Sequence, residues 1–121
     1  MRAYFKLLFL IPALALVRCT QQVDPSADIP TVSYSQEISP IISSNCALSG
    51  CHDGNSHEFA LLSYSDLMHY VTPADAHGSQ LYEVIRLYSG ERAMPPSPNT
   101  PLTDQQIASI YVWILQGALD N

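Results

Sequence analysis

The sequence predicts a small all-α domain in which short helices are joined by long loops. Apolar residues recur at helical spacing, as at Ile38, Ile41 and Ile42. Two segments open with a capping box, in which Ser63 precedes Asp66 and Thr103 precedes Gln106 by three positions. Prolines and glycines crowd the stretches between the apolar runs, and these residues end helices and shape loops.

The first 18 residues are predicted to be a signal peptide. A basic start is followed by an apolar run over 7–17, which is too short for a membrane span. The run leads into Leu-Val-Arg-Cys, which resembles a bacterial lipobox with Cys19 as the lipid-bearing residue, although Arg18 stands where a small residue is usual. The alternative is that Cys19 is discarded with the leader.

Residues 19–31 are polar and contain prolines, so they are expected to form a tether between the lipid and a domain over 32–121. Without the leader the chain carries two arginines and eleven acidic residues, a net charge of 2 − 11 = −9. This charge disfavours binding to nucleic acid or to anionic lipid, and it suits either a basic partner surface or solubility alone.

The first helix is expected within 33–45, with Ser39 as N-cap before Pro40. The capping box at Ser63 predicts a second helix over about 64–71. A third helix is expected to follow Ser79 and to end at Gly90, with the apolar residues Leu81, Tyr82, Val84, Ile85 and Tyr88.

The last helix is expected over 104–116, closed by Gly117. One face would carry Ile107, Ile110, Tyr111 and Ile114, with Trp113 at the edge of that face. Before this helix, residues 91–101 form a stiff proline-rich loop that holds Met94 directly before two prolines. Short helices with long loops make a poor core, so we expect an additional group to complete it.

The stretch Cys46-Ala-Leu-Ser-Gly-Cys51-His52 carries the chemistry. Two thiols followed at once by a histidine suit covalent attachment of a c-type haem, with the imidazole as an iron ligand. Four residues separate the cysteines where two are usual, so the intervening loop must bulge, which Gly50 permits. Two alternatives remain: a Cys46–Cys51 disulfide, and a zinc site that includes His52 and His57.

These motifs together resemble the small class I c-type cytochrome domains of exported bacterial lipoproteins. The resemblance covers 32–121 and rests on Ile-x-Pro-Ile at 38–41, the Cys-Cys-His stretch, the Met-Pro-Pro loop at 94–96 and the pattern of 102–118. It implies a cytochrome c-like fold around one covalent haem c. It also implies thioether bonds from Cys46 and Cys51, with His52 and Met94 as the iron ligands.

Other residues could serve in place of these. Met68 is the alternative thioether ligand, and His57, His69 and His77 are alternative distal ligands. Arg92 could pair with a haem propionate or be a solvated loop residue. We expect the haem to pack against Ile41, Leu62, Ile85, Ile114 and the Met94 loop.

The expected function is electron transfer between redox partner proteins of the cell envelope, by a lipid-anchored monohaem cytochrome without enzymatic activity. With both axial positions filled, no open iron position remains for a substrate. The alternatives are a disulfide-stapled structural or interaction lipoprotein without haem, and a peroxidatic or gas-sensing haem site in which Met94 is not bound.

Overall fold

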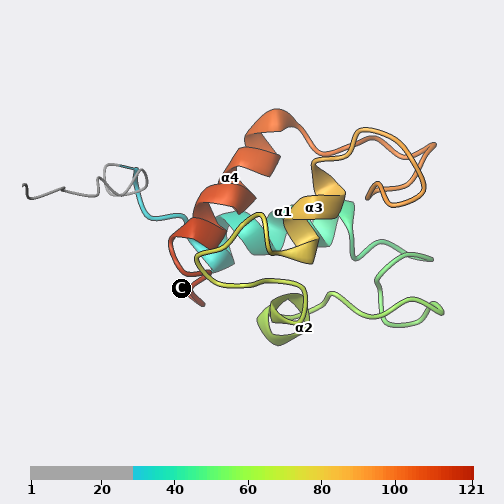
Figure 1. The fold of residues 1–121 in the computed structure, drawn as a ribbon. Coiled ribbons are helices and arrows are strands. Elements are labelled where there is room, and N and C mark those ends of the chain that lie inside the picture. Colours follow the sequence, from blue (N-terminus) through green and yellow to red (C-terminus); the bar gives the residue numbers. More distant parts are fainter. Residues whose placement is uncertain (1–28) are drawn as a thin grey trace, which may run out of the picture.

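The computed structural model describes residues 29–121, and helices are the only regular secondary structure in that part of the chain. The all-α prediction is therefore confirmed. The predicted signal peptide, Cys19 and most of the predicted tether lie outside the described residues. Among residues 29–121, no helix is both long and apolar enough to cross a membrane. The elements in chain order are η1 (Tyr34–Ile38), α1 (Ser39–Asn45), α2 (Tyr64–Met68), α3 (Gln80–Ile85) and α4 (Asp104–Leu115) (Figure 1).

The first helical segment begins earlier than predicted. Its N-cap is Ser33, whose hydroxyl accepts a hydrogen bond from the Gln36 N–H, and the expectation that Ser39 is the N-cap was wrong. A π-helical turn, η1, precedes α1, so the segment continues through Pro40. Proline has no N–H to donate, so one backbone hydrogen bond is missing at Pro40. The wider π turn places this missing bond near the start of α1, where its loss destabilises the helix least.

The two middle helices are shorter than predicted. The capping box of Ser63 and Asp66 forms as expected at the start of α2, which ends at Met68. Helix α3 ends at Ile85, well before Gly90. Ser79 precedes α3, but its fully buried hydroxyl bonds the backbone of the preceding turn at Thr72 and Asp75 instead of capping the helix.

Helix α4 organises the core. Its predicted capping box and its closure before Gly117, which has a φ of +97°, are both confirmed. Trp113 was expected at the edge of the apolar face, but it is fully buried and its indole N–H donates to the Leu119 carbonyl at 2.9 Å. Tyr34 of η1 and Tyr64 of α2 pack near its ring, at centroid distances of 5.8 and 6.4 Å.

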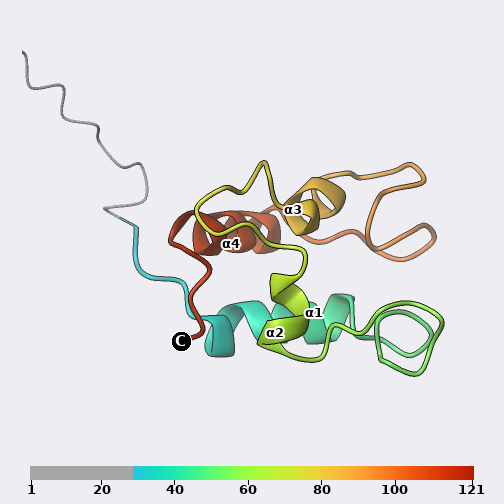
Figure 2. The ribbon, with the colours of Figure 1, turned by 60° about the horizontal axis from the view of Figure 1, so that its bottom comes forward.

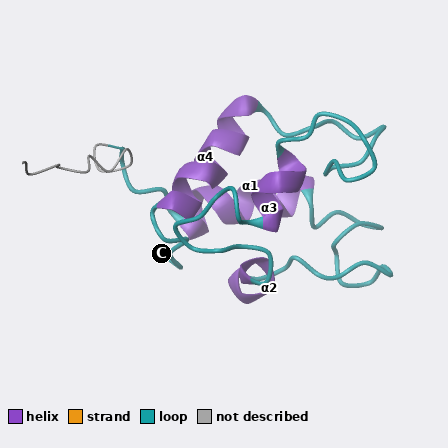
Figure 3. Ribbon diagram, in the orientation of Figure 1, coloured by secondary structure: helices purple, strands orange, loops and turns teal. Residues whose placement is uncertain are grey.

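The two long loops lie on one side of the helices. Figures 1 and 2 show residues 46–63, after α1, and residues 86–103, after α3, projecting from the same side of the molecule. Figure 3 shows that both segments lack helix over most of their length. The opposite end holds α4, η1 and the C-terminal residues. There the side-chain oxygen of Asn121 accepts a hydrogen bond from the Tyr34 N–H, and its backbone carbonyl accepts one from the Ser35 N–H. The helices thus hold two loops next to each other, and both loops carry predicted site residues.

Candidate functional site

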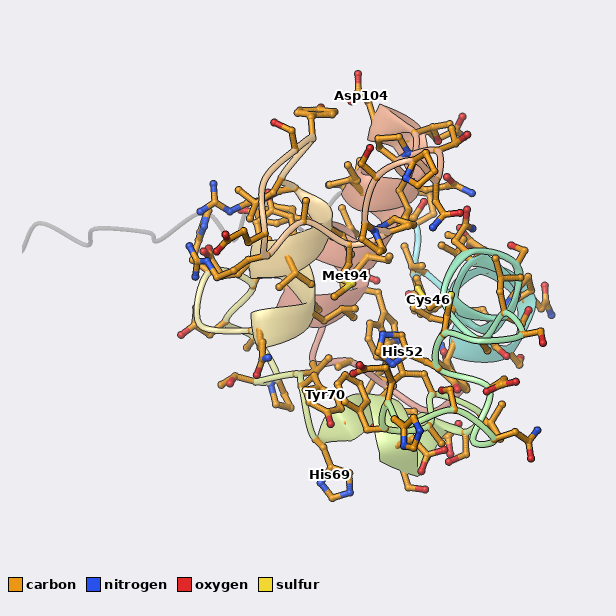
Figure 4. All side chains as sticks on the ribbon, turned by 90° about the vertical axis from the view of Figure 1, so that its right-hand side faces the viewer. Cys46, His52, His69, Tyr70, Met94 and Asp104 are labelled. Atoms are coloured by element: carbon orange, nitrogen blue, oxygen red, sulfur yellow. The ribbon has the colours of Figure 1, made fainter. Side chains whose placement is uncertain are left out.

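A cavity of about 320 Å³ lies between the two loops, and all four predicted haem-binding residues of the domain line it. Cys46, Cys51 and His52 come from the first loop, and Met94 comes from the second. Figure 4 shows Met94 above His52, with Cys46 to one side. The wall between them is apolar and is formed by Leu61, Leu67, Leu81, Val84 and Ile85, together with Pro95 and Pro96.

The cysteine loop is a compact bulge at the end of α1. The Cys46 N–H donates to the Ile42 carbonyl at 2.8 Å, so the first cysteine is fixed by the last helical turn. The Cys51 N–H donates to Leu48 O at 2.9 Å, and the His52 N–H donates to Cys46 O at 3.1 Å. Gly50 has a φ of +81°, a conformation that side chains with a Cβ rarely adopt. The bulge therefore leaves both cysteines at one cavity, and Gly50 itself forms part of the cavity lining.

Cys46 and Cys51 are free thiols in the structure. Cys46 is buried, and this burial raises the pKa of its thiol to about 11, with a further contribution from the nearby Cys51. The thiolate is the nucleophilic form of cysteine. The Cys46 sulfur is consequently protonated and poorly reactive near neutral pH in the folded chain.

His52 is held in a defined tautomer. The residue is only 8% exposed, and the Nδ1 of its imidazole lies 2.9 Å from the Phe59 carbonyl oxygen. Because a carbonyl can only accept, Nδ1 must carry the proton and donate. Nε2 then has the free lone pair, as a metal-ligating imidazole requires, and the Nδ1 hydrogen bond is the usual partner that orients such a ring.

Met94 is anchored through its backbone. The Met94 N–H donates to Val84 O of α3 at 3.1 Å, and the neighbouring Ala93 is 3% exposed. Pro95 and Pro96 follow and restrict the backbone directly after the ligand candidate. The thioether is therefore presented from a loop that is pinned to the same helix that forms the cavity wall.

The alternative ligands lie elsewhere. Met68 is half-buried against the main core, and His57, His69 and His77 are exposed; none of the four lines the cavity. Figure 4 shows His69 pointing away from the site. Within residues 29–121 there is no cluster of three His, Cys, Asp or Glu side chains able to hold a metal ion. The donor set thus lacks the ligands of a structural zinc site and fits haem, which needs two thiols, a neutral imidazole and a second axial donor.

Several residues that were expected to contact the haem do not line the cavity. Ile85 lines the cavity as predicted, but Leu62 is 64% exposed and Ile114 is fully buried in the core around Trp113. Leu61 takes the place of Leu62, since neighbouring residues of an extended segment face opposite ways. Arg92 is exposed and does not line the cavity.

Two aromatic residues that line the cavity were not predicted as site residues. Phe59 and Tyr70 both lie along its wall, with Phe59 next to His52 and Tyr70 next to Phe59. Phe59 begins the short apolar segment after the polar turn 53–58, and this was the only signal available in the sequence. Tyr70 lies just after α2 and carries no spacing relative to the cysteines that would indicate the site.

Comparisons with known proteins identify no relative. No protein-family model matches the chain, and neither a curated protein nor a solved structure matches it. A functional assignment therefore depends on the residues and geometry of the cavity.

Proposed function

We propose that this protein is a monohaem c-type cytochrome that carries single electrons, with a cytochrome c-like fold wrapped around one covalent haem. The observation that supports the proposal is that a single cavity is lined by both thiols, the imidazole and the Met94 thioether. These groups come from sequence positions 46 to 94, yet they meet at one apolar space.

Four residues would bind the haem, two through thioether bonds and two as iron ligands. Cys46 and Cys51 would form the thioether bonds, His52 would ligate the iron through Nε2, and Met94 would ligate it from the other loop. When bound, the haem supplies a one-electron Fe(III)/Fe(II) couple. A thioether is a neutral, soft ligand that favours Fe(II) and gives a higher reduction potential than a second histidine would.

The anchoring of Met94 favours electron transfer over ligand binding or catalysis. Its loop is tied to Val84 and packed through Ala93, which would keep the sixth position filled. An iron with both axial positions occupied has no site for oxygen or peroxide. The protein would then exchange electrons with its partners without changing a substrate of its own.

The cell envelope is the proposed location. The predicted leader 1–18 and the predicted lipid-bearing Cys19 would export the chain and attach it to a membrane through lipid, with 19–31 as tether. The acidic domain would meet redox partner proteins in the periplasm or at the outer membrane, and no nucleic acid is expected to bind.

A visible spectrum in denaturant tests the proposal. The full chain would be produced together with a cytochrome c maturation system, unfolded in guanidinium and passed through a desalting column. We expect the haem absorption to remain with the polypeptide, because thioether bonds survive unfolding. The matched variant Cys46→Ser/Cys51→Ser should be colourless. A colourless wild-type protein that contains a Cys46–Cys51 disulfide would refute the proposal and support the structural lipoprotein.

A further inference from the structure

The imidazole of His52 is the first ring of an aromatic stack. The centroid of the Phe59 ring lies 4.4 Å from that of His52, and the planes are tilted by 31°. Tyr70 covers the other side of Phe59 at 4.3 Å, with an angle of 25°. Rings at these separations are in direct contact and attract one another beyond the effect of burial.

The chain folds back on itself to build this stack. Asp53 accepts hydrogen bonds from the N–H groups of Asn55 and Ser56, which turns the backbone sharply after His52. The Leu61 N–H then donates to His52 O at 3.0 Å. Phe59 consequently faces His52 through both its carbonyl, which binds Nδ1, and its ring.

The general core does not hold Phe59 in place. The residue is 43% exposed, and a phenylalanine with so much surface in water gains little from burial. Tyr70, in contrast, is fixed between two elements, because its N–H donates to Leu67 O of α2 and its carbonyl accepts from the Leu81 N–H of α3, both at 3.0 Å. Tyr70 is thus the fixed end of the stack, and Phe59 lies between Tyr70 and His52 and contacts both rings.

We propose that Phe59 and Tyr70 are positioning residues, whose stacked rings keep the Nδ1–H of His52 on the Phe59 carbonyl and so fix the imidazole for iron ligation. The inference rests on the proposed haem function. A strong Nδ1–H hydrogen bond makes the imidazole a better electron donor and stabilises Fe(III). Loosening the stack should therefore weaken this hydrogen bond and raise the reduction potential.

The test compares three single variants of the haem-loaded full chain. Tyr70→Leu removes the outer ring, Tyr70→Phe keeps it, and Tyr111→Leu removes a ring from a different pair, which Tyr111 forms with Tyr82 at 5.1 Å. The first readout is the hydrogen-exchange rate of the His52 Nδ1–H, measured by NMR in the Fe(II) state. The second readout is the midpoint potential, measured by spectroelectrochemistry. Because Tyr70 lines the cavity, its loss can shift the potential through the haem environment alone, so the exchange rate of the Nδ1–H is the deciding readout.

We expect Tyr70→Leu to speed Nδ1–H exchange by about 2- to 12-fold, the range given by one aromatic contact. Its potential should rise. Tyr70→Phe should restore both values, and Tyr111→Leu should leave both unchanged while lowering Tm. If Tyr70→Leu does not fold, Phe59→Leu provides the same comparison with the backbone carbonyl intact. Covalent haem with unchanged Nδ1–H exchange in Tyr70→Leu, whatever its potential, would overturn the stack proposal alone, whereas a wild-type protein without haem would overturn the proposed function as well.

Discussion

Replacing Met94 with alanine should open the iron to small ligands while leaving the haem attached. In the proposed cytochrome, attachment would need Cys46 and Cys51 and the proximal position would need His52, and none of these residues contacts Met94 through a hydrogen bond. The variant should lose the near-infrared sulfur–iron band of the oxidised protein, and its potential should fall. The same change should give weak peroxidase activity.

The size of the effect on ligand affinity can be worked out from the loop. In the wild type, an imidazole at the iron would have to displace the thioether, and we expect the loop to lift with it. Lifting it breaks the hydrogen bond from the Met94 N–H to Val84 O, which contributes about 1 kcal/mol, and exposes the buried Ala93 methyl, about another 0.8 kcal/mol. In Met94→Ala neither loss is needed. Imidazole should therefore bind at least about 20-fold more tightly, before any contribution from the iron–sulfur bond itself.

Imidazole titrations followed by visible absorption provide the measurement. Met68→Ala is the matched control, because it removes the same side chain from α2, outside the cavity. The control should keep the wild-type band and affinity. If Met94→Ala bound imidazole no more tightly than the wild type and kept its near-infrared band, the assignment of Met94 as distal ligand would be wrong. If Met68→Ala lost the band, Met68 would be the ligand.

Three further predictions concern the cysteines. Cys19→Ser should move the protein from the membrane to the soluble fraction with its haem intact; a variant that still sediments with membranes would contradict the lipid anchor. In the folded chain before haem attachment, the rate of Cys46 alkylation should rise about tenfold per pH unit between about pH 8 and 10. The reason is that the thiolate is the minor form of Cys46 below its pKa of about 11. An alkylation rate that levels off near about pH 9 would show that the thiol is not buried. Cys46→Ser/Cys51→Ser should keep its overall helical circular dichroism and slow hydrogen exchange in α4, but show rapid hydrogen exchange in both loops. Full protection of the loops without haem would contradict a role for haem in ordering them.

The sequence was most informative where local chemistry decides the structure. The capping boxes at Ser63 and Thr103 depend on side chains three residues apart, and both form as predicted. The ends of α2 and α3 were missed. Helix α2 closes in a local turn, in which the His69 and Tyr70 N–H groups donate to Asp66 O and Leu67 O, and α3 stops near Val84, whose carbonyl accepts from Met94 of the following loop. Trp113 was misplaced for a similar reason. Its burial depends on Tyr34 and Tyr64, which come from distant parts of the chain.

The candidate site divides in the same way. Cys46, Cys51 and His52 form a local motif, and Met94 was recognised from its loop and from the resemblance. Their meeting at one cavity is a property of the fold. Phe59 and Tyr70 escaped prediction because no sequence spacing relates them to His52; the turn closed by Asp53 brings Phe59 back, and α2 delivers Tyr70.

The division between core and cavity bears on what haem contributes to folding. We expected haem to supply much of the core, but Trp113, Ile110 and Ile114 bury one another among the helices and do not line the cavity. This part of the core needs no contact with haem, whereas five residues of the same buried cluster also line the cavity beside the loops over 46–63 and 86–103: Cys46, Leu61, Leu67, Leu81 and Ile85. A haem bound there would join the two loops through His52 and Met94 and exclude water from the apolar wall. Its chief structural effect would be to order the loops, and these are the segments that set the ligation and the potential of the iron.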